Sequence, residues 1–500
     1  MVERVGVIDL GSNTTRLIVV GYTPHHSFKL LDEVRETVRL AEGIGTDGRL
    51  QPAPMARGVA AMALFANYCK AMGVSRIVPA ATSAVREAAN QAEFLDAVER
   101  ASGMRMRVLS AEEEAYYGYL GTINALALRD GFLIDIGGGS TQVTMIRDRG
   151  FVQAFSRPLG ALRISDRYVH TDPISTKEFK ALEQAAVTAF ADLDWFAAAG
   201  DAMLAGIGGT IRTLAEIDMK ARSYPYDRVH GYVFSRDRLE ALVEQLRTLT
   251  LRQREDLPGL SRDRADLILG GAVLLRQLMR QGSFDTITAS GQGLREGLFY
   301  EHLLAGEAPP LLADPRGFSV LNLARIYNYE AAHSAKVCEL ALALFDQLHP
   351  LHGYGAWERD ILAHAALIHD IGIAVGYYDH HKHGEYLVLN AALLGFSHRE
   401  IVLLAQLVRF HRKGDVVVER HRDILEDGDA ARVAKLAALL RIAEYLERRK
   451  SQVIQSLHVE IGDTVRVITQ TIGDAAIEIW DANRRTGLFK KAYRRDIEIV

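Results

Sequence analysis

Residues 131–146 read GFLIDIGGGSTQVTMI. An apolar stretch ends at Asp135, three glycines follow at 137–139, and Ser140 and Thr141 precede a return to β-branched residues. β-branched residues on both sides of a short turn of glycines and hydroxyls predict a β-hairpin. The segment therefore predicts a strand, a polar turn and a second strand.

The N-terminus repeats this plan. Residues 4–22 read RVGVIDLGSNTTRLIVVGY, in which Asp9 stands where Asp135 stands in the later copy, 126 residues on. The turn residues of this first copy are Gly11, Ser12, Asn13 and Thr14. A duplicated unit of this kind predicts two similar α/β lobes.

Two further glycine turns follow in the second lobe. Residues 203–210 read MLAGIGGT and end in Gly208, Gly209 and Thr210, and a periodic apolar stretch at 211–217 then predicts a helix. Residues 287–293 read ITASGQG and lead into a predicted helix over 294–304. Both segments predict the order strand, glycine turn, helix.

The second half of the chain has a different pattern. Residues 305–317 are rich in Gly, Pro and Ala, which indicates a domain boundary, and helical periodicity then runs from 323 to about 449. Residues 456–500 alternate, in LHVEIGDTVRVITQ and AAIEIWDA, and predict a small strand-containing domain. We therefore expect two α/β lobes, an all-α domain and a small α+β domain, with the boundaries 1–128, 129–305, 315–450 and 451–500.

Composition limits the class of protein. A net charge of −4 over 500 residues gives no global attraction for nucleic acid, so an acidic ligand needs a local basic surface. The longest apolar run, at 361–378, contains His364, His369 and Asp370, which argues against a membrane span. Cys69 and Cys338 match no metal spacing and fit a reducing compartment, so we expect a cytoplasmic protein.

The two turns carry the residue types that bind a phosphoryl group. Glycines let backbone N–H groups converge on an anion, hydroxyls add donors, and an aspartate at a strand end can hold a divalent cation. One such turn alone would more simply be a tight hairpin, but two matched copies and a third glycine turn favour phosphate binding. The predicted phosphate-binding residues are Gly11, Ser12, Asn13, Thr14, Gly137, Gly138, Gly139, Ser140, Thr141, Gly208, Gly209 and Thr210.

Six motifs stand in a fixed order along the chain: VPAATSAVREAAN (78–90), VLSAEEEAYYGYLG (108–121), DIGGGST (135–141), PLGALR (158–163), GIGGT (206–210) and GQGLREG (291–297). Over essentially its whole length the sequence resembles the exopolyphosphatase and guanosine pentaphosphate phosphatase family. The paired turns are similar to those of the wider actin, sugar kinase and heat-shock ATPase superfamily. The resemblance implies two actin-like (ribonuclease-H-like) lobes, a homodimer, and Mg²⁺ as the cofactor, with K⁺ as a second candidate.

Glu114 is the candidate base that orients or deprotonates the attacking water. It stands in the triplet 112–114 behind Ser110, and Ser110 with Glu113 makes the pattern of a capping box, so Glu113 has a structural role available. Glu112 suits the positive end of the helix dipole, which leaves Glu114 without a local role. The resemblance also puts the catalytic glutamate here, before Ala115; the alternative is three acids that solvate a helix start.

The predicted metal ligands are Asp9, Asp135 and Gln142. The resembling family usually has an acid where this chain has Gln142, and a neutral amide can coordinate only through its carbonyl oxygen. Metal affinity or preference is therefore in question at this position. Arg86 and Arg163 are candidates to pair phosphate oxygens, Arg86 the stronger of the two, and a structural role is about as plausible for each.

The helical domain is rich in histidine. His333, the pair His369 and Asp370, and Glu444 are similar to the ligand pattern of metal-dependent HD-type phosphohydrolases, except that Glu444 replaces an aspartate. A second metal site and a relic whose polar residues bond one another both remain open, and we favour the relic. Basic residues between 409 and 450 are either a solvated face or a track for a long polyanion.

The favoured function is processive, Mg²⁺-dependent hydrolysis of terminal phosphate from inorganic polyphosphate. Guanosine pentaphosphate is the nearest alternative substrate for the same site. A kinase or ATP-driven protein of the same superfamily, and a nucleotide hydrolase that uses the histidine cluster, are less favoured.

Overall fold

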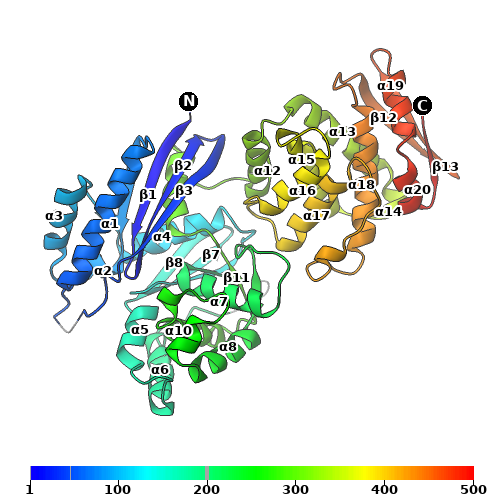
Figure 1. Ribbon diagram of the computed structural model, residues 1–500. Coiled ribbons are helices and arrows are strands. Elements are labelled where there is room, and N and C mark those ends of the chain that lie inside the picture. Colours follow the sequence, from blue (N-terminus) through cyan, green and yellow to red (C-terminus); the bar gives the residue numbers. More distant parts are fainter. Residues whose placement is uncertain (1, 45–46, 198–201) are drawn as a thin grey trace. The chain divides into compact units, whose positions relative to one another are not determined.

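The computed structural model describes residues 2–44, 47–197 and 202–500, which form two compact units that divide between Ala313 and Asp314. The first unit holds two sheet-based lobes, and the second holds a helical domain followed by a small sheet (Figure 1). The predicted order of fold classes along the chain is confirmed.

The sheet of lobe I has the strand order β3-β2-β1-β4-β5. Its strands are β1 (Glu3–Leu10), β2 (Thr14–Thr23), β3 (Ser27–Thr37), β4 (Arg76–Ala81) and β5 (Arg107–Val108). The first three strands are antiparallel, and β4 and β5 extend the sheet in parallel. β1 and β2 form the hairpin predicted for residues 4–22, and Asp9 pairs with Arg16 across it.

Lobe II repeats this plan in a sheet of order β10-β11-β9-β6-β7-β8. Its strands are β6 (Gly131–Ile136), β7 (Thr141–Arg147), β8 (Gly150–Arg157), β9 (Met203–Ile207), β10 (Val233–Ser235) and β11 (Thr286–Ala289). The antiparallel run β6-β7-β8 is continued by parallel β9 and β11, and Asp135 pairs with Gln142 as Asp9 pairs with Arg16. The duplication predicted from the two turns is present in the sheet register.

The helices of this unit are α1 (Pro52–Ala71), α2 (Ser83–Arg86), α3 (Gln91–Ser102), α4 (Ala111–Ile123), α5 (Ala161–Tyr168), α6 (Thr176–Ala189), α7 (Gly208–Ala221), α8 (Arg236–Thr248), α9 (Leu251–Glu255), the 3₁₀ helix η1 (Arg262–Arg264), α10 (Ile268–Gln281) and α11 (Leu294–Leu303). α4 and α11 pack against each other, and α11 also lies on β1 and β2. There the ring centroids of Phe299 and Tyr22 are 5.6 Å apart. The helix predicted over 294–304 therefore follows lobe II in sequence but packs on the sheet of lobe I.

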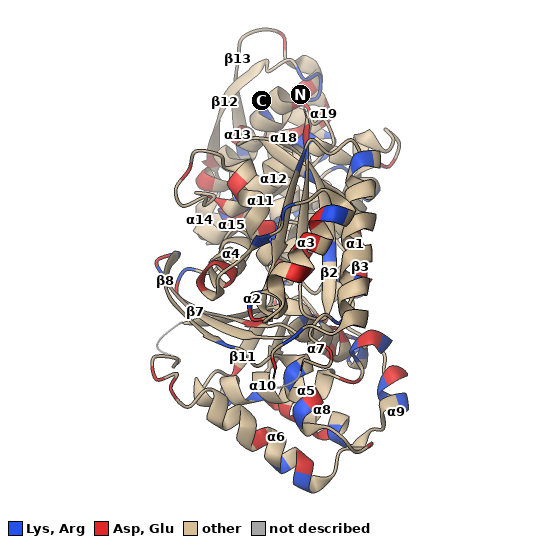
Figure 2. Ribbon diagram, turned by 90° about the vertical axis from the view of Figure 1, so that its left-hand side faces the viewer, with Lys and Arg blue, Asp and Glu red and all other residues tan. Residues whose placement is uncertain are grey.

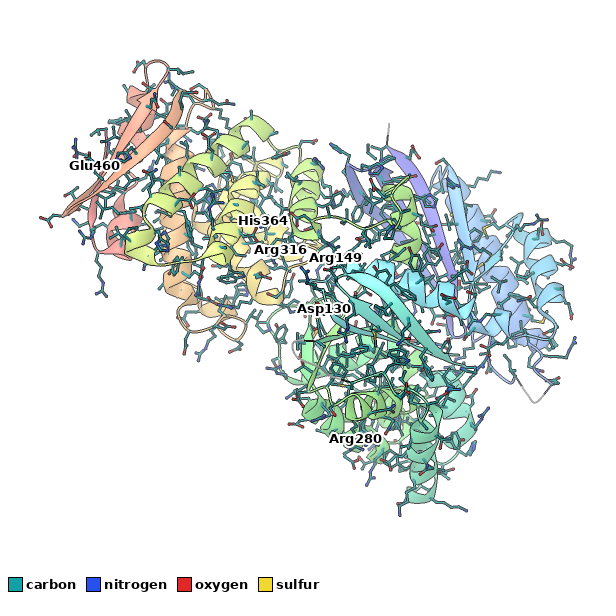
Figure 3. The ribbon with its side chains drawn as sticks, turned by 180° about the vertical axis from the view of Figure 1, so that it is seen from behind. Asp130, Arg149, Arg280, Arg316, His364 and Glu460 are labelled. Carbon is teal, nitrogen blue, oxygen red and sulfur yellow. The ribbon has the colours of Figure 1, made fainter. Side chains whose placement is uncertain are left out.

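A short segment of lobe II also links the two lobes. Asp263 pairs with Arg35 at the end of β3, and Asp266 lies 2.7 Å from Arg39. These carboxylates flank the last residue of η1, Arg264. Arg149, in the turn between β7 and β8, donates to the carbonyl of Leu312 at 2.8 Å and so holds the end of the first unit in place (Figure 3).

The second unit begins with α12 (Pro315–Ile326), α13 (Ala331–Gln347), α14 (His349–His352), α15 (Ala356–Ile368), η2 (Ile371–Ala374), α16 (His380–Asn390), α17 (His398–Phe410), η3 (Glu419–His421) and α18 (Asp429–Leu446). Arg316 at the start of α12 reaches Asp360 of α15 at 2.8 Å and Glu400 of α17 at 2.9 Å (Figure 3). The all-α pattern predicted from residue 323 onward is confirmed.

The C-terminal segment contains β12 (Ile454–Ile461), β13 (Thr464–Thr471), α19 (Ala476–Asn483), α20 (Gly487–Tyr493) and β14 (Asp496–Ile499). β12 and β13 are the predicted strands, but AAIEIWDA, which alternates in sequence, forms the helix α19. The buried carboxylate of Glu478 explains the difference, because it accepts two hydrogen bonds from Arg449 at 2.7 and 2.8 Å. The buried positions of α19 are Glu478, Asp481 and Ala482, which follow the helical period, so the alternation of apolar residues does not mark the buried face.

Charged residues are mixed over the surface. In the ribbon of Figure 2, acidic and basic residues are interspersed along α6 and α8 of lobe II, as the small net charge leads one to expect. No helix among the described residues combines the length and apolar character needed to cross a membrane.

Candidate active site

The glycine turns of the two lobes line one cavity of about 130 Å³. It lies where β1 and β6 end, with the first turns of α4 and α7 beside it. The predicted site residues that line it are Asp9, Gly11, Ser12, Asn13, Thr14, Glu114, Asp135, Gly137, Gly138, Gly139, Ser140, Gly208, Gly209 and Thr210. Residues that are up to 201 positions apart in the sequence, from Asp9 to Thr210, therefore line the same cavity.

The two duplicated turns touch each other. A Cβ placed on Gly139 would lie 2.4 Å from the hydroxyl of Ser12 and 2.5 Å from that of Ser83, so only glycine allows this approach. Ser12 and Ser83 are themselves hydrogen-bonded at 2.9 Å. The contact places the polar groups of both turns beside the same cavity.

The third glycine segment differs from its predicted form, because Gly208, Gly209 and Thr210 are the first residues of α7 and not a separate turn. The first N–H groups of a helix have no partner within it and bind anions well. The hydroxyl of Thr210 and the amide oxygen of Asn13 are buried without a hydrogen-bond partner among the described residues. These polar atoms are available to a bound phosphate or its metal ion.

Glu114 is placed by the local structure that the sequence predicts. Ser110 and Glu113 form the capping box of α4, which directs Glu114 to the inner face of the first turn. Glu114 is 8% exposed, lines the cavity, and accepts a hydrogen bond from Arg86 at 2.8 Å. Burial raises the pKa of this carboxyl, while Arg86 opposes the rise. A carboxylate with a raised pKa beside phosphate-binding donors suits a general base.

Asp9 and Asp135 are the carboxylates at the strand ends. Burial raises the pKa of Asp9, and burial together with the charges of Glu114 and Asp9 raises that of Asp135 from 3.8 to about 7. Three carboxyl groups so close together repel one another when ionised, and a hard divalent cation with oxygen ligands offsets that repulsion. The donor set at this position therefore fits Mg²⁺.

Four of the residues proposed from sequence lie outside the cavity lining. Arg86 donates a hydrogen bond to Glu114, and Arg163 pairs with Glu87. The hydroxyl of Thr141 donates to Leu159 O at 2.7 Å, and the amide of Gln142 donates to Ser140 Oγ at 2.9 Å. All four contact neighbouring protein groups in this structure, and their predicted roles stay predictions.

The sequence interpretation missed four arginines, Arg16, Arg212, Arg264 and Arg295, which line the cavity. Burial, with Arg212 and Arg295 next, lowers the pKa of Arg16 to about 9, and burial with Arg16 lowers that of Arg264 to about 10. Such shifts mean that the guanidinium groups lie in a buried cluster of like charge. Three of these arginines come shortly after a glycine turn: Arg16 is two residues after Thr14, Arg212 two after Thr210, and Arg295 two after Gly293. Their positions could therefore have indicated a role in the site. Arg264 lies outside every motif.

Gly209→Ala is expected to displace Arg264 from the cavity and to lower the rate of phosphate release by about tenfold or more, as loss of one phosphate-stabilising donor does. A Cβ at this position would lie 2.0 Å from a guanidinium nitrogen of Arg264, and the end of a flexible side chain can move away without unfolding the protein. Kinetics on the purified variant, with circular dichroism to check folding, test this. Unchanged activity would show that Arg264 does not act on the substrate.

The helical unit brings together the predicted histidine cluster. His333, His369, Asp370 and Glu444 offer ligand atoms that all lie within 4.8 Å of one another, and so do Asp370, His380 and His411. Asp370 is common to both groups.

Comparison with known proteins agrees with this geometry. Two α/β lobes whose paired glycine turns close on one cavity define the actin-like class of phosphate-binding proteins. Within that class the chain belongs to the Ppx/GppA phosphatase family, whose model matches residues 18–305, and the model of Ppx/GppA phosphatase domain III matches residues 316–472.

Two solved structures are similar to this chain over 60% of its length. An exopolyphosphatase from Cytophaga hutchinsonii has 25% sequence identity and a TM-score of 0.56, over 60% of this chain and 98% of its own. A Ppx/GppA family member from Aquifex aeolicus has 26% identity and a TM-score of 0.52, over 60% of this chain and 97% of its own.

Proposed function

We propose that this chain is an exopolyphosphatase that removes terminal orthophosphate processively, with Mg²⁺, from inorganic polyphosphate. The observation that carries the proposal is the cavity itself, which is lined by four arginines, two glycine turns and carboxylates that include Asp9, Glu114 and Asp135. A phosphoanhydride needs cationic and N–H donors around its oxygens and a carboxylate near the attacking water, and the lining supplies both. The similarity to a protein described as an exopolyphosphatase supports this substrate.

The lining also favours a ligand made of phosphates. Among the described lining residues there is no aromatic side chain that could stack on a guanine base, and the apolar ones are aliphatic. A linear polyphosphate presents only oxyanions and suits such a surface. Guanosine pentaphosphate would place its terminal phosphate in the same cavity but leave its base outside the described lining.

Each residue then has a defined task. The N–H groups of both turns and of the first turn of α7 bind the terminal phosphoryl oxygens, and the guanidinium groups neutralise their charge. Asp9 and Asp135 would hold Mg²⁺, which offsets charge on the phosphate oxygens when bound. Glu114 accepts the proton of the attacking water, and Arg86 keeps the carboxylate of Glu114 oriented.

Phosphate release from polyphosphate, guanosine pentaphosphate and ATP at matched concentrations tests the proposal. We expect polyphosphate to give the highest kcat/KM and ATP to give none. A preference for guanosine pentaphosphate would keep the site but replace the substrate. ATP turnover or phosphate transfer, or loss of all activity in His369→Ala with the carboxylate cavity intact, would contradict the proposal.

The Mg²⁺ response is expected to weaken as the pH falls below about 7. The pKa of Asp135 is raised from 3.8 to about 7, so in the metal-free protein its stabilising contribution is fully present below about pH 4 and is lost as the pH rises through about 7. Protons and Mg²⁺ compete for the same carboxylate. The half-saturating Mg²⁺ concentration should therefore be higher at pH 6 than at pH 8, and the Mg²⁺-induced rise in Tm should be smaller.

Asp135→Asn is the control for this titration. The variant should lose most of the Mg²⁺ response at both pH values, because a neutral amide replaces the charged carboxylate ligand. Equal half-saturating concentrations at pH 6 and pH 8 in the unmodified protein would show that Asp135 does not hold the ion.

A further inference from the structure

A buried cluster of six metal-ligating side chains lies in the helical unit, apart from the proposed phosphate site. Its members come from α13, α18, the loop that follows α15, the start of α16 and the end of α17. They are His333, His369, Asp370, His380, His411 and Glu444. His369 and His411 are fully buried, and His333 is 3% exposed.

The hydrogen bonds of the histidines fix where their protons are. Nδ1 of His369 lies 2.7 Å from the carbonyl oxygen of Ala366, and Nδ1 of His411 lies 2.6 Å from that of Val408. A carbonyl oxygen only accepts, so both Nδ1 atoms carry hydrogen. In the neutral ring the Nε2 atom then carries a lone pair, which is the form that binds a metal ion.

His380 follows the same rule. Its Nδ1 is 3.0 Å from the carbonyl oxygen of Tyr377, closer than the 3.4 Å to the guanidinium of Arg412. Three imidazoles therefore have their Nδ1 atoms held by the carbonyl three residues before them. Their Nε2 atoms all point into the cluster.

These Nε2 atoms lie close to one another and to carboxylate oxygens. Nε2 of His369 lies 2.9 Å from Glu444 Oε2, and Nε2 of His380 lies 3.2 Å from Nε2 of His411 and 3.1 Å from Asp370 Oδ1. With hydrogen on both Nδ1 atoms, the neutral rings of His380 and His411 direct lone pairs at each other in a buried site, which is unfavourable unless a cation lies between them.

His333 and Asp370 give a second, independent observation. Neither ring nitrogen of His333 meets hydrogen-bond geometry with a described group, although Nε2 is 3.1 Å from Glu444 Oε2. Asp370 Oδ1 is likewise buried without a hydrogen bond. One nitrogen of His333 and one oxygen of Asp370 lie within 4.8 Å of the ligand atoms of His369 and Glu444.

We propose that the helical unit holds a dinuclear centre for divalent transition-metal ions, with Asp370 shared between its two positions. One position has the ligands His333, His369, Asp370 and Glu444, and the other has Asp370, His380 and His411. Imidazole with carboxylate suits Mn²⁺, Fe²⁺, Co²⁺, Ni²⁺ or Zn²⁺, in contrast to the all-oxygen set at Asp9 and Asp135.

The centre is open to small ligands on one side. A cavity of about 260 Å³ is lined by Asp370, Lys450 and residues 327–330, among others. The amine of Lys450 lies 3.8 Å from Asp370 Oδ2. Asp370 Oδ2 also faces Nε2 of His333 and of His369, so the cavity adjoins the position with four protein ligands and gives it room for a water or an anionic oxygen.

Titration of metal-stripped, full-length protein with Co²⁺ in excess Mg²⁺ tests this proposal, because Mg²⁺ fills the carboxylate site and leaves the imidazole site free. We expect two Co²⁺ per chain by calorimetry and metal analysis, with the visible spectrum of nitrogen-ligated Co²⁺. His411→Ala should still bind one Co²⁺ per chain. Asp370→Ala should bind at most one Co²⁺ per chain, and only weakly. The readout is binding, so failure of the proposed exopolyphosphatase reaction would leave it unaffected.

His364→Ala is the matched control, because His364 is a buried histidine of α15 that contacts Asp360 and lies outside the cluster (Figure 3). It should bind two Co²⁺. His411→Gln, with circular dichroism, covers the case in which the alanine variant does not fold. Absence of Co²⁺ binding in the unmodified protein, or ¹⁵N NMR that shows protons on the Nε2 atoms with no metal bound, would overturn the proposal.

Discussion

Glu114→Gln is expected to lower kcat for phosphate release from polyphosphate by about 10²- to 10⁴-fold, the usual contribution of a general base. The amide keeps the size of the side chain and can still accept a hydrogen bond from Arg86, but it cannot take a proton from water. KM should change little, because the carboxylate acts on the attacking water and not on substrate binding. Steady-state kinetics with saturating Mg²⁺ measure both constants.

Glu112→Gln is the matched control. Glu112 is an exposed glutamate in the same first turn of α4, so the substitution removes the same charge two residues away. Near-normal activity is expected there. Near-normal activity in Glu114→Gln as well would exclude Glu114 as the base.

Arg212→Met is expected to lower kcat/KM for polyphosphate by at least about 10²-fold, because an arginine that neutralises transition-state charge in phosphoryl transfer contributes about 10³–10⁵-fold at the upper end. Among the described residues no carboxylate forms an ion pair with Arg212, and burial followed by Arg295 lowers its pKa. Its charge is therefore unfavourable in the ligand-free protein. The Tm of the variant should be unchanged or higher while activity falls.

Lys220→Met supplies the comparison for this result. Lys220 is an exposed residue of the same helix, α7, paired with Asp227 at 3.1 Å, and its loss should leave kcat/KM unchanged. Should Arg212→Met keep its activity, or lose activity only together with a large fall in Tm, Arg212 is structural and not part of the phosphate site.

The architecture was predictable because its signals are local. A strand, a polar turn and a second strand are contained within sixteen residues at 131–146. The same pattern at the N-terminus predicts that the chain has two similar lobes. The position of Glu114 was predictable for the same reason, since the capping box of Ser110 and Glu113 assigns the neighbouring carboxylates their directions.

The charge of the cavity was not predictable in this way. Arg264 comes from η1, which carries no motif, and reaches the cavity only because the chain folds back between the lobes. The direction of Gln142 depends on a contact with Ser140 that no spacing specifies. Periodicity also failed for α19, where the partner of Glu478 lies 29 residues earlier, at Arg449. Long-range pairing decided each of these cases.

Other predictions from the sequence stay predictions. The homodimer, the cytoplasmic location and the placement of domain boundaries at 128, 305 and 450 rest on composition, pattern and resemblance. The extent of the basic surface used by a long polyphosphate is likewise untested.

The segment around η1 has two structural roles. Asp263 and Asp266 hold lobe I through Arg35 and Arg39, and Arg264 between them supplies a positive charge to the cavity. The ion pairs that join the lobes and a positive charge of the cavity therefore depend on the same few residues, so a substitution that loosens the segment around η1 will weaken both.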